Sequence, residues 1–384
     1  MKIAAFRNFL SIKAGAQGAF INMMESLRRR NHKIDIYVLD ISDELRNELE
    51  EHGFNVTSLS FKEWKIAGLD VIHTFNDFRA MYQLRKWAKK INNGNYDIAF
   101  VDHHYYSPLL LPFFKIPKVY YCYEPPRCYY ETIISNDIRP KIYKIITILS
   151  KYIDKYCVKF ADLILCNSDY EREYIWRTYG IFPVTNYLGV DLEKYRKLNL
   201  EKENLVVSVG VLSPVKAHDF VIRSIGMIPK NKRPRFVIIT AGITSDKEEK
   251  KLYKLAAQNN VDLEIKNKYI SDEEFAELHS KAKVVAIAYI MDPSIEPVAL
   301  AFETPIVAVR EAGARETIIN GETGILTNRD EREFAEAIEY LLDHPEVAAE
   351  MGRKGREWIE KNFTWGKCAE NLEKNFERVL NSKR

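Results

Sequence analysis

The sequence has no hydrophobic run long enough to span a membrane. Nowhere among its 384 residues do the roughly 18 consecutive apolar residues of a transmembrane helix occur. Met1 leads directly into a short apolar segment, residues 2–6, and no secretory signal pattern precedes it. We therefore expect a cytoplasmic protein and leave open a peripheral contact with the inner face of the membrane.

Cysteine is also scarce. The five cysteines, Cys122, Cys128, Cys157, Cys166 and Cys368, form no CxxC pair and no spacing typical of a metal site, and their number is odd. Free thiols in a reducing compartment fit this pattern best. Since the sequence contains no convincing cluster of metal ligands, we expect no metal site.

A strong excess of charge of one sign is absent as well. The 57 basic and 54 acidic residues leave a formal net charge of +3, which is too small to favour nucleic acid as a partner. With 46% hydrophobic and 29% charged residues, the chain has the composition of a globular protein. Because 384 residues exceed one ordinary hydrophobic core, we expect two domains of similar size.

Short apolar segments that favour strands alternate with helical segments along most of the chain. The predicted strands are 3–6, 34–39, 56–59, 70–75, 98–102, 119–122, 162–166, 205–209, 236–240, 261–265, 284–288 and 305–309. Such alternation is typical of doubly wound sheets. We therefore predict an α/β fold with two Rossmann-like domains, residues 1–192 and 193–362, and a cleft between them. The charged stretch 193–204 is the predicted linker.

Two turns that follow predicted strands have the residues of a binding site. Gly15, Ala16, Gln17 and Gly18 are small or polar residues where the backbone can approach a ligand, although they do not form the dinucleotide pattern GxGxxG. Glu296 and Pro297 begin a short apolar segment, and proline suits the first turn of a helix. A helix start at the carboxyl end of a parallel strand favours an anionic ligand. An ordinary connection with an exposed acid remains the alternative.

The region 105–160 is rich in aromatic and basic residues. His103 and His104 precede it, and its last part, 141–160, is an amphipathic segment with five lysines. Such a helix can lie on an anionic membrane surface. It can equally be a solvated helix face whose lysine stems cover apolar side chains.

Several segments together resemble the retaining glycosyltransferases of family GT4, which have the GT-B fold. The similar segments are 162–168 (DLILCNS), 188–191 (LGVD), 209–216 (VGVLSPVK), 308–316 (AVREAGARE) with 320–324 (NGETG), 15–17 (GAQ) and 121–127 (YCYEPPR). The last of these is similar to a motif of mannosyltransferase-like members. Each segment is weak alone, but together they follow the order of the family.

The resemblance implies transfer of a sugar from a UDP- or GDP-sugar, with retention of configuration, to a glycan, polysaccharide or lipid-linked acceptor. It implies no cofactor and no metal, a donor-binding C-terminal domain, an acceptor-binding N-terminal domain and a last helix, within 363–384, that returns to the N-terminal domain. The expected catalytic residues are Glu296, Lys216 and His103. The expected substrate-binding residues are Gly15, Ala16, Tyr123, Arg127, Lys216, Ile270, Glu296, Val298, Ala299, Leu300 and Glu303.

Sugar transfer from a nucleotide donor requires only a few functional groups from the protein. Negative charge builds on the departing diphosphate, and fixed positive groups or backbone N–H donors lower that barrier. Lys216 is the candidate cation, with a solvated lysine at a helix start as the alternative. Glu296 would hold sugar hydroxyls and so place the anomeric carbon. His103 would serve the acceptor side, with a buried structural histidine as the alternative.

Two departures from the family pattern leave other functions open. Val211 stands where the family has a phosphate-binding arginine, and the segment from Glu296 to Pro305 is shorter than the family segment, which carries two glutamates. Glu303 is the candidate for the second. One alternative is therefore a catalytically impaired partner subunit that binds nucleotide-sugar. Another is a GT-B nucleotide-sugar epimerase, which would need acid and base groups but no acceptor.

Overall fold

The computed structural model describes residues 1–13, 15–61, 73–103, 105–130, 141–240, 246–268, 270–290 and 296–382, with side chains for all of these except 73–78, 128 and 141–146. His104 and the side chains of Lys141 and Lys144 lie outside the described part. The chain forms two compact units. Unit 1 contains Met1–Tyr187 with Trp365–Arg384, and unit 2 contains Leu188–Thr364.

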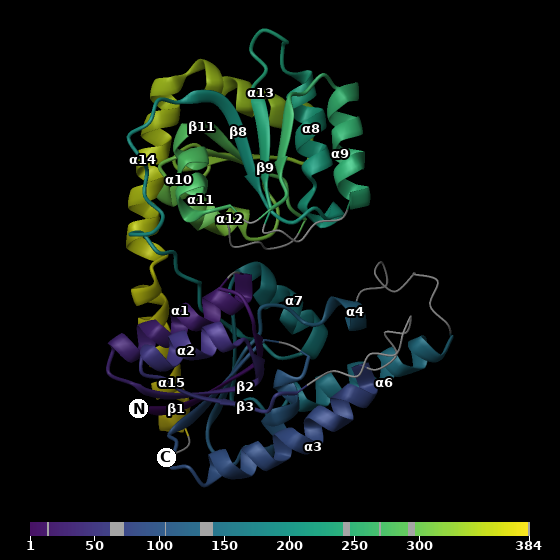
Figure 1. Cartoon of the computed structure of the whole chain (residues 1–384), viewed down its shortest axis with the longest axis vertical. Helices are drawn as coiled ribbons and strands as arrows, with labels where there is room; N and C mark the ends of the chain where they lie inside the picture. The colour runs from purple at the N-terminus through teal and green to yellow at the C-terminus, as the bar shows by residue number, and fades with distance from the viewer. Residues whose placement is uncertain are drawn as a thin grey trace. The chain divides into compact units, whose positions relative to one another are not determined.

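Unit 1 is built on a parallel sheet in the order β3-β2-β1-β4-β5-β6-β7. Its strands are β1 (Lys2–Leu10), β2 (Lys33–Ile41), β3 (Asn55–Ser58), β4 (Ile98–Asp102), β5 (Lys118–Tyr121), β6 (Leu163–Cys166) and β7 (Val184–Thr185). Helices cover both faces of the sheet (Figure 1). They are α1 (Gly15–Arg29), α2 (Asp43–Glu51), α3 (His73–Asn92), η1 (Ser107–Phe113), α4 (Arg127–Tyr130), α6 (Lys141–Val158), α7 (Asp169–Tyr179) and α15 (Trp365–Ser382).

The predicted elements of unit 1 are largely present, with one clear error. Residues 73–75 of the predicted strand 70–75 belong to α3, and residues 70–72 lie outside the described part. The apolar residues there suited either a strand or the first turn of a helix, and the sequence pattern alone did not separate the two. Helix α7 begins at Asp169 because Ser168, its N-cap, accepts a hydrogen bond from the Glu171 amide at 3.1 Å.

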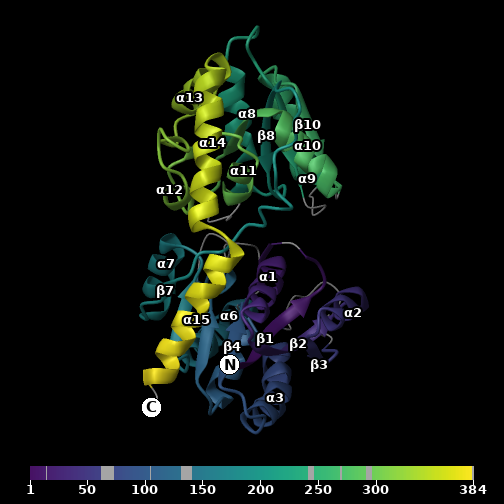
Figure 2. The same ribbon diagram turned by 90° about the vertical axis from the view of Figure 1, so that its left-hand side faces the viewer.

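The last helix, α15, packs within unit 1 although it follows unit 2 in sequence. Figure 2 shows it running alongside α1. Its apolar face, which includes Leu372 and Phe376, is buried, and the Phe376 ring meets Phe100 edge to face at 5.8 Å. On its other side, Glu373 pairs with Arg30 and lies 3.0 Å from His32 Nε2. Apolar burial therefore holds the helix against the sheet, and an ion pair fixes its rotation.

Unit 2 has the strand order β10-β9-β8-β11-β12-β13, again all parallel. The strands are β8 (Glu203–Val209), β9 (Arg235–Ile239), β10 (Leu263–Lys266), β11 (Ala282–Ile287), β12 (Ile306–Val309) and β13 (Gly324–Thr327). The helical segments are η2 (Pro214–Lys216), α8 (His218–Met227), α9 (Asp246–Gln258), α10 (Asp272–Lys281), α11 (Glu296–Ala301), α12 (Ala314–Thr317), α13 (Glu331–Asp343) and α14 (Pro345–Asn362). Strand β13 was not predicted from the sequence.

The predicted linker 193–204 is held on unit 2 rather than left free. Arg356 on α14 donates to the carbonyl oxygens of Tyr195 at 2.9 Å and Leu192 at 3.3 Å. The same guanidinium donates to the Ala301 carbonyl at the end of α11, at 2.7 Å. A single arginine thus joins the chain that enters the unit, the end of α11 and α14.

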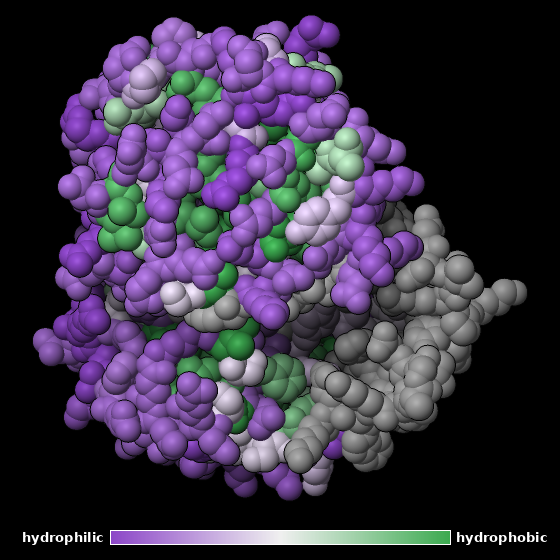
Figure 3. Space-filling view, turned by 45° about the horizontal axis from the view of Figure 1, so that its top comes forward, coloured by the Kyte–Doolittle hydropathy of each residue, from purple (hydrophilic) through white to green (hydrophobic). Residues whose placement is uncertain are grey.

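The described surface is mostly hydrophilic, with smaller hydrophobic patches on the face in Figure 3. Among the helices of the described residues, none is both long enough and apolar enough to cross a membrane.

His279 on α10 is a buried titratable group in the core of unit 2. Its ring stacks on Phe302 with centroids 4.8 Å apart, and its Nδ1 lies 2.9 Å from the Phe275 carbonyl oxygen. Burial lowers the pKa of His279 to about 4, and the nearby charge of Lys202 acts in the same direction. The ring is therefore neutral at pH 7.

We predict that His279 makes the protein less stable as the pH falls from about 6.5 towards 4. In this interval the unfolded chain binds the proton that the folded chain excludes, so protons favour unfolding. His279→Phe keeps an aromatic ring and removes the titration. Between pH 7 and pH 5 the unfolding free energy of the wild type should fall by about 2 kcal/mol more than that of the variant, as measured by urea unfolding. Parallel pH curves for the two proteins would contradict this.

Candidate functional site

The strand order of unit 2 places a candidate site at the carboxyl ends of β8 and β11. These two central strands are neighbours, and the chain leaves them towards opposite sides of the sheet. In doubly wound sheets ligands bind at this switch point. The residues that follow the two strands, Gly210 to His218 and Ala288 to Ile290, form the floor of the site.

Lys216 lies directly over Tyr289. Lys216 ends the short η2 turn, and its Nζ is 4.4 Å from the centroid of the Tyr289 ring. The two chain segments are also joined through the backbone, since the Ile290 amide donates to the Val215 carbonyl at 3.0 Å. The ring face attracts the ammonium group and fixes where this positive charge stands.

Gly210 allows this arrangement because it has no side chain. A Cβ atom at this position would lie 3.2 Å from the Tyr289 hydroxyl oxygen and 3.3 Å from the Lys216 side chain. The glycine therefore leaves room for both residues at the end of β8. Val211, which follows, is half-buried and supplies no positive charge.

His218 completes the buried side of the site. Its Nδ1 lies 3.4 Å from Ser208 Oγ, and its ring meets Tyr289 edge to face at 6.4 Å. Burial lowers the pKa of His218 to about 4, with a smaller contribution in the same direction from the charge of Lys216. His218 is therefore neutral at pH 7, and Lys216 supplies the positive charge over the Tyr289 ring.

Glu296 is the second charged residue that acts on Tyr289. It is the first residue of α11 and is fully buried. The pKa of the Tyr289 hydroxyl is raised, mainly by burial and secondly by the negative charge of Glu296. Tyr289 is thus the common neighbour of the two charged residues that the sequence singled out, Lys216 and Glu296.

Arg329 is a contributor that the sequence interpretation missed. It follows β13 and donates to the carbonyl oxygens of Ala288 at 3.1 Å and Tyr289 at 3.2 Å. It also forms a two-pronged ion pair with Glu311, which follows β12. The guanidinium therefore fixes the ends of three strands, β11, β12 and β13, relative to one another.

The other predicted residues of unit 2 differ in how far their side chains are buried. Val298 is half-buried, whereas the side chains of Ala299 and Leu300 belong to the core. Any ligand contact of Ala299 or Leu300 would have to come from the backbone. Ile270 follows β10, at the carboxyl edge, and packs against the core beside that edge.

Glu303 is not brought to the site. It stands before β12, at the amino edge of the sheet, and pairs with Lys197 at 3.2 Å. Glu296 stands at the opposite edge, after β11. The segment between them runs from the carboxyl edge of the sheet back to the amino edge, so Glu303 does not supply a second site carboxylate.

In unit 1 four predicted residues gather at the carboxyl edge. Gly15 and Ala16 begin α1, and the Tyr123 hydroxyl donates to the Ala16 carbonyl at 3.4 Å. The His103 ring lies edge to face with Tyr123 at 6.0 Å. The loop before Gly15 is fixed by Gln17, whose Oε1 accepts from the Ser11 amide at 2.6 Å. His103, Tyr123 and the Gly15 turn therefore form one polar and aromatic group.

A buried ion pair beneath this group was not predicted. Arg7 on β1 pairs with Asp102, the last residue of β4, and both are almost inaccessible. Burial raises the pKa of Tyr123, and the Arg7 guanidinium opposes this rise. The only sequence signal was an arginine in an otherwise apolar strand.

Arg127 is committed to contacts within unit 1. Its Nε donates to Glu124 at 2.5 Å, and another guanidinium nitrogen lies 3.7 Å from the buried Glu171. The guanidinium also covers the Tyr174 ring at 5.2 Å. These contacts favour a structural role for Arg127 rather than the predicted substrate contact.

Comparison with known families assigns both halves of the chain. Residues 14–194 match the family model described as "Glycosyltransferase Family 4", and residues 191–358 match "Glycosyl transferases group 1". The two matches together cover both units as far as α14.

Individual relatives are distant. An uncharacterized glycosyltransferase of Methanocaldococcus jannaschii is 26% identical over 61% of this chain and 64% of its own length. A D-inositol 3-phosphate glycosyltransferase of Saccharomonospora viridis is 26% identical over 57% of this chain and 56% of its own length. The matched region therefore spans less than two thirds of these curated relatives.

Solved structures share the fold over the whole length. Sucrose-phosphate synthase from Thermosynechococcus elongatus has a TM-score of 0.74 and 17% identity, with 99% of each chain covered. Anabaena HepE, solved with UDP and glucose, has a TM-score of 0.75 and 15% identity, with 98% of this chain and 100% of HepE covered. The family matches and the two parallel-sheet units confirm the expected resemblance: the chain belongs to the GT4 family of glycosyltransferases and has the GT-B fold.

Proposed function

We propose that this glycosyltransferase moves a hexosyl group from a UDP- or GDP-sugar to a glycan, polysaccharide or lipid-linked acceptor, with retention of configuration. The observation that carries the donor assignment is the placement of Lys216 and Glu296 around Tyr289, at the switch point of unit 2. HepE, solved with UDP-glucose, supports a uridine nucleotide as the first donor to test.

The two charged residues suit two parts of such a donor. Lys216 offers a positive charge to the diphosphate, whose negative charge grows as the bond to the sugar breaks. Glu296 offers a carboxylate to sugar or ribose hydroxyls, which would orient the anomeric carbon. Both residues act on Tyr289, so this ring is the reference point for the two parts of the proposed donor site.

Unit 1 is the proposed acceptor side. Its carboxyl edge presents His103 and Tyr123 beside the Gly15 turn. Hydroxyl-rich acceptors are bound by such mixtures of aromatic rings and hydrogen-bonding groups. A capsular polysaccharide glycosyltransferase of Staphylococcus aureus is among the relatives, at 25% identity over 54% of this chain, and supports testing polysaccharide acceptors first.

We propose that Lys216 and backbone N–H groups supply the positive potential at the diphosphate without a metal ion. The rate of donor turnover should then be unchanged by EDTA. Loss of activity in EDTA that added Mg²⁺ or Mn²⁺ restores would contradict this part of the proposal.

A catalytically impaired partner subunit is the second candidate, and Val211 is the observation that favours it. The site has one lysine where the family pattern places an arginine as well. Binding of nucleotide diphosphates without any donor turnover, across a panel of UDP- and GDP-sugars, would select this function over catalysis. Release of the nucleotide from a donor would select the transferase.

We predict that Lys216→Ala weakens the binding of UDP or GDP. Loss of a hydrogen bond to a charged phosphate should cost about 1.5–3 kcal/mol of binding free energy, measured by calorimetry. The control is Lys230→Ala, which removes an exposed lysine that follows the C-terminal end of α8, whereas Lys216 precedes the start of this helix. This control should leave the affinity unchanged. Equal affinities for Lys216→Ala and wild type would remove Lys216 from the site.

We also predict that Glu296→Gln lowers the rate of sugar transfer at least tenfold, equivalent to about 1.4 kcal/mol in the barrier. The substitution keeps the shape of the side chain, so the fold should survive. The matched control is Glu303→Gln, which removes the same charge at the amino edge and should leave the rate unchanged. Loss of activity in Glu303→Gln but not in Glu296→Gln would show that the roles are exchanged.

A further inference from the structure

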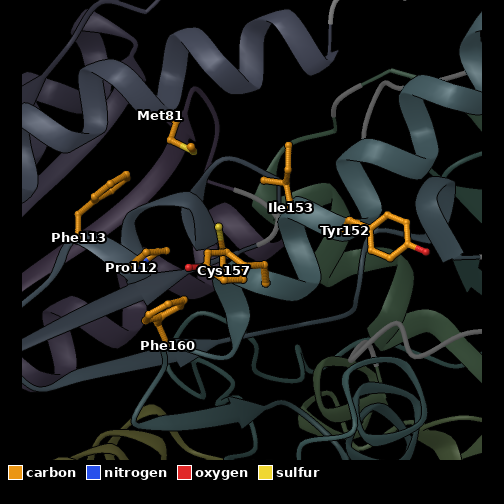
Figure 4. A pocket seen from close by; sticks show the side chains of 8 residues that line it. Met81, Pro112, Phe113, Tyr152, Ile153, Cys157 and Phe160 are labelled. Atoms are coloured by element: carbon orange, nitrogen blue, oxygen red, sulfur yellow. The ribbon is translucent and has the colours of Figure 1, made fainter.

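An open apolar cavity lies in unit 1, away from both groups of site residues described above. Its volume is about 530 Å³. It is lined by Met81 of α3, Pro112 and Phe113 of η1, Tyr152, Ile153, Tyr156 and Cys157 of α6, and Phe160. In Figure 4 the side chains of Met81, Phe113, Ile153, Cys157 and Phe160 surround the cavity, and the Tyr152 ring extends outward from its rim. The lining offers carbon and sulfur surface and little hydrogen bonding.

The cavity is distinct from the proposed acceptor group. Phe113 and Phe160 come shortly before the first residues of β5 and β6, so this side of the cavity is at the amino edge of the sheet. His103 and Tyr123 follow the strands β4 and β5, at the opposite edge. A ligand in the cavity would therefore not be the sugar acceptor.

An exposed apolar stripe on α6 leads into the cavity. Ile148, Tyr152, Tyr156 and Phe160 follow one another at four-residue intervals and are 52%, 69%, 60% and 37% exposed. This spacing puts them on one face of the helix. The rings of Tyr156 and Phe160 meet edge to face at 5.1 Å. A stripe of large apolar side chains exposed to water is typical of a surface that binds another protein or a membrane.

Lysines run beside this stripe. Lys151, Lys155 and Lys159 each precede one of its aromatic residues, and neither Lys155 nor Lys159 forms an ion pair with another described residue. The one acid between residues 147 and 160, Asp154, is buried and accepts hydrogen bonds from Tyr130 and Tyr179 at 2.8 Å. Its charge is therefore turned away from the surface.

Helix α3, on the other side of the cavity, adds to the same charge. From residue 79 to residue 92 it contains Arg79, Arg85, Lys86, Lys89 and Lys90 and no acidic residue. The chain as a whole is almost balanced, at +3. The basic residues are thus concentrated on the elements that surround the apolar cavity.

We propose that this surface docks the protein on an anionic membrane, with the hydrocarbon chain of an anionic lipid in the cavity. Tyrosine rings suit the headgroup level, and lysines close to the surface are attracted to anionic headgroups. An apolar cavity ringed by positive charge matches a lipid, which joins a hydrocarbon chain to a negative headgroup. This anchoring site is independent of the proposed transfer reaction and of its acceptor.

Sedimentation with vesicles tests the surface. The whole protein should sediment with phosphatidylglycerol–phosphatidylcholine vesicles at low salt, less at high salt, and not with phosphatidylcholine alone. Lys155→Glu with Lys159→Glu should weaken binding roughly tenfold or more. Lys250→Glu with Lys254→Glu is the matched control, because these exposed lysines have the same four-residue spacing on α9 of unit 2. Circular dichroism and thermal unfolding verify that both variants are folded.

A second measurement tests the cavity. Phe160→Trp places an indole at its wall, and phosphatidylglycerol with a spin label on its acyl chain should quench the added fluorescence beyond the wild-type level. Sedimentation without this quenching would remove the lipid chain from the cavity. The proposal would be overturned if the protein did not bind anionic vesicles at low salt, or if it bound neutral vesicles equally well. It would also be overturned if the α9 control variant lost as much binding as the α6 variant.

Discussion

The candidate donor site depends on Tyr289, because the ammonium group of Lys216 stands over its ring and the charge of the buried Glu296 acts on its hydroxyl. Glu296 has no accessible surface, and burying a carboxylate is costly unless nearby groups compensate it. The ammonium group of Lys216 stands over the face of the Tyr289 ring. Because the Tyr289 carbonyl accepts a hydrogen bond from Arg329, the ends of β11 and β13 fix the residue over which Lys216 stands.

The same sheet architecture serves two different purposes in the two units. In unit 2 the carboxyl edge holds charged residues that suit an anionic donor. In unit 1 the carboxyl edge holds His103 and Tyr123 above the buried pair of Arg7 and Asp102. Truncating one member of such a pair would leave an uncompensated buried charge, so Arg7 and Asp102 keep this edge rigid. The amino edge of unit 1 carries the apolar cavity instead.

Local signals predicted much of the fold, and long-range contacts explain what they missed. The bounds of helix α7 are set by local residues, since Ser168 caps its start and Gly180, in a left-handed conformation, ends it. Glu296 was singled out because it begins an apolar segment after a predicted strand, and Lys216 because its segment resembles a GT4 motif. No local pattern could show that Lys216 meets Tyr289, or that Glu303 turns to Lys197, because each contact joins segments far apart in the chain.

Amide hydrogen exchange of the whole protein, with and without UDP or GDP, tests most directly where the donor nucleotide binds. Binding at the switch point of unit 2 predicts slower exchange in residues 210–218 and 296–301, which border Lys216 and Glu296. The segment around Glu303 and Lys197, at the amino edge, should not change. Protection confined to unit 1, or no protection of residues 210–218 at saturating nucleotide, would contradict the assignment.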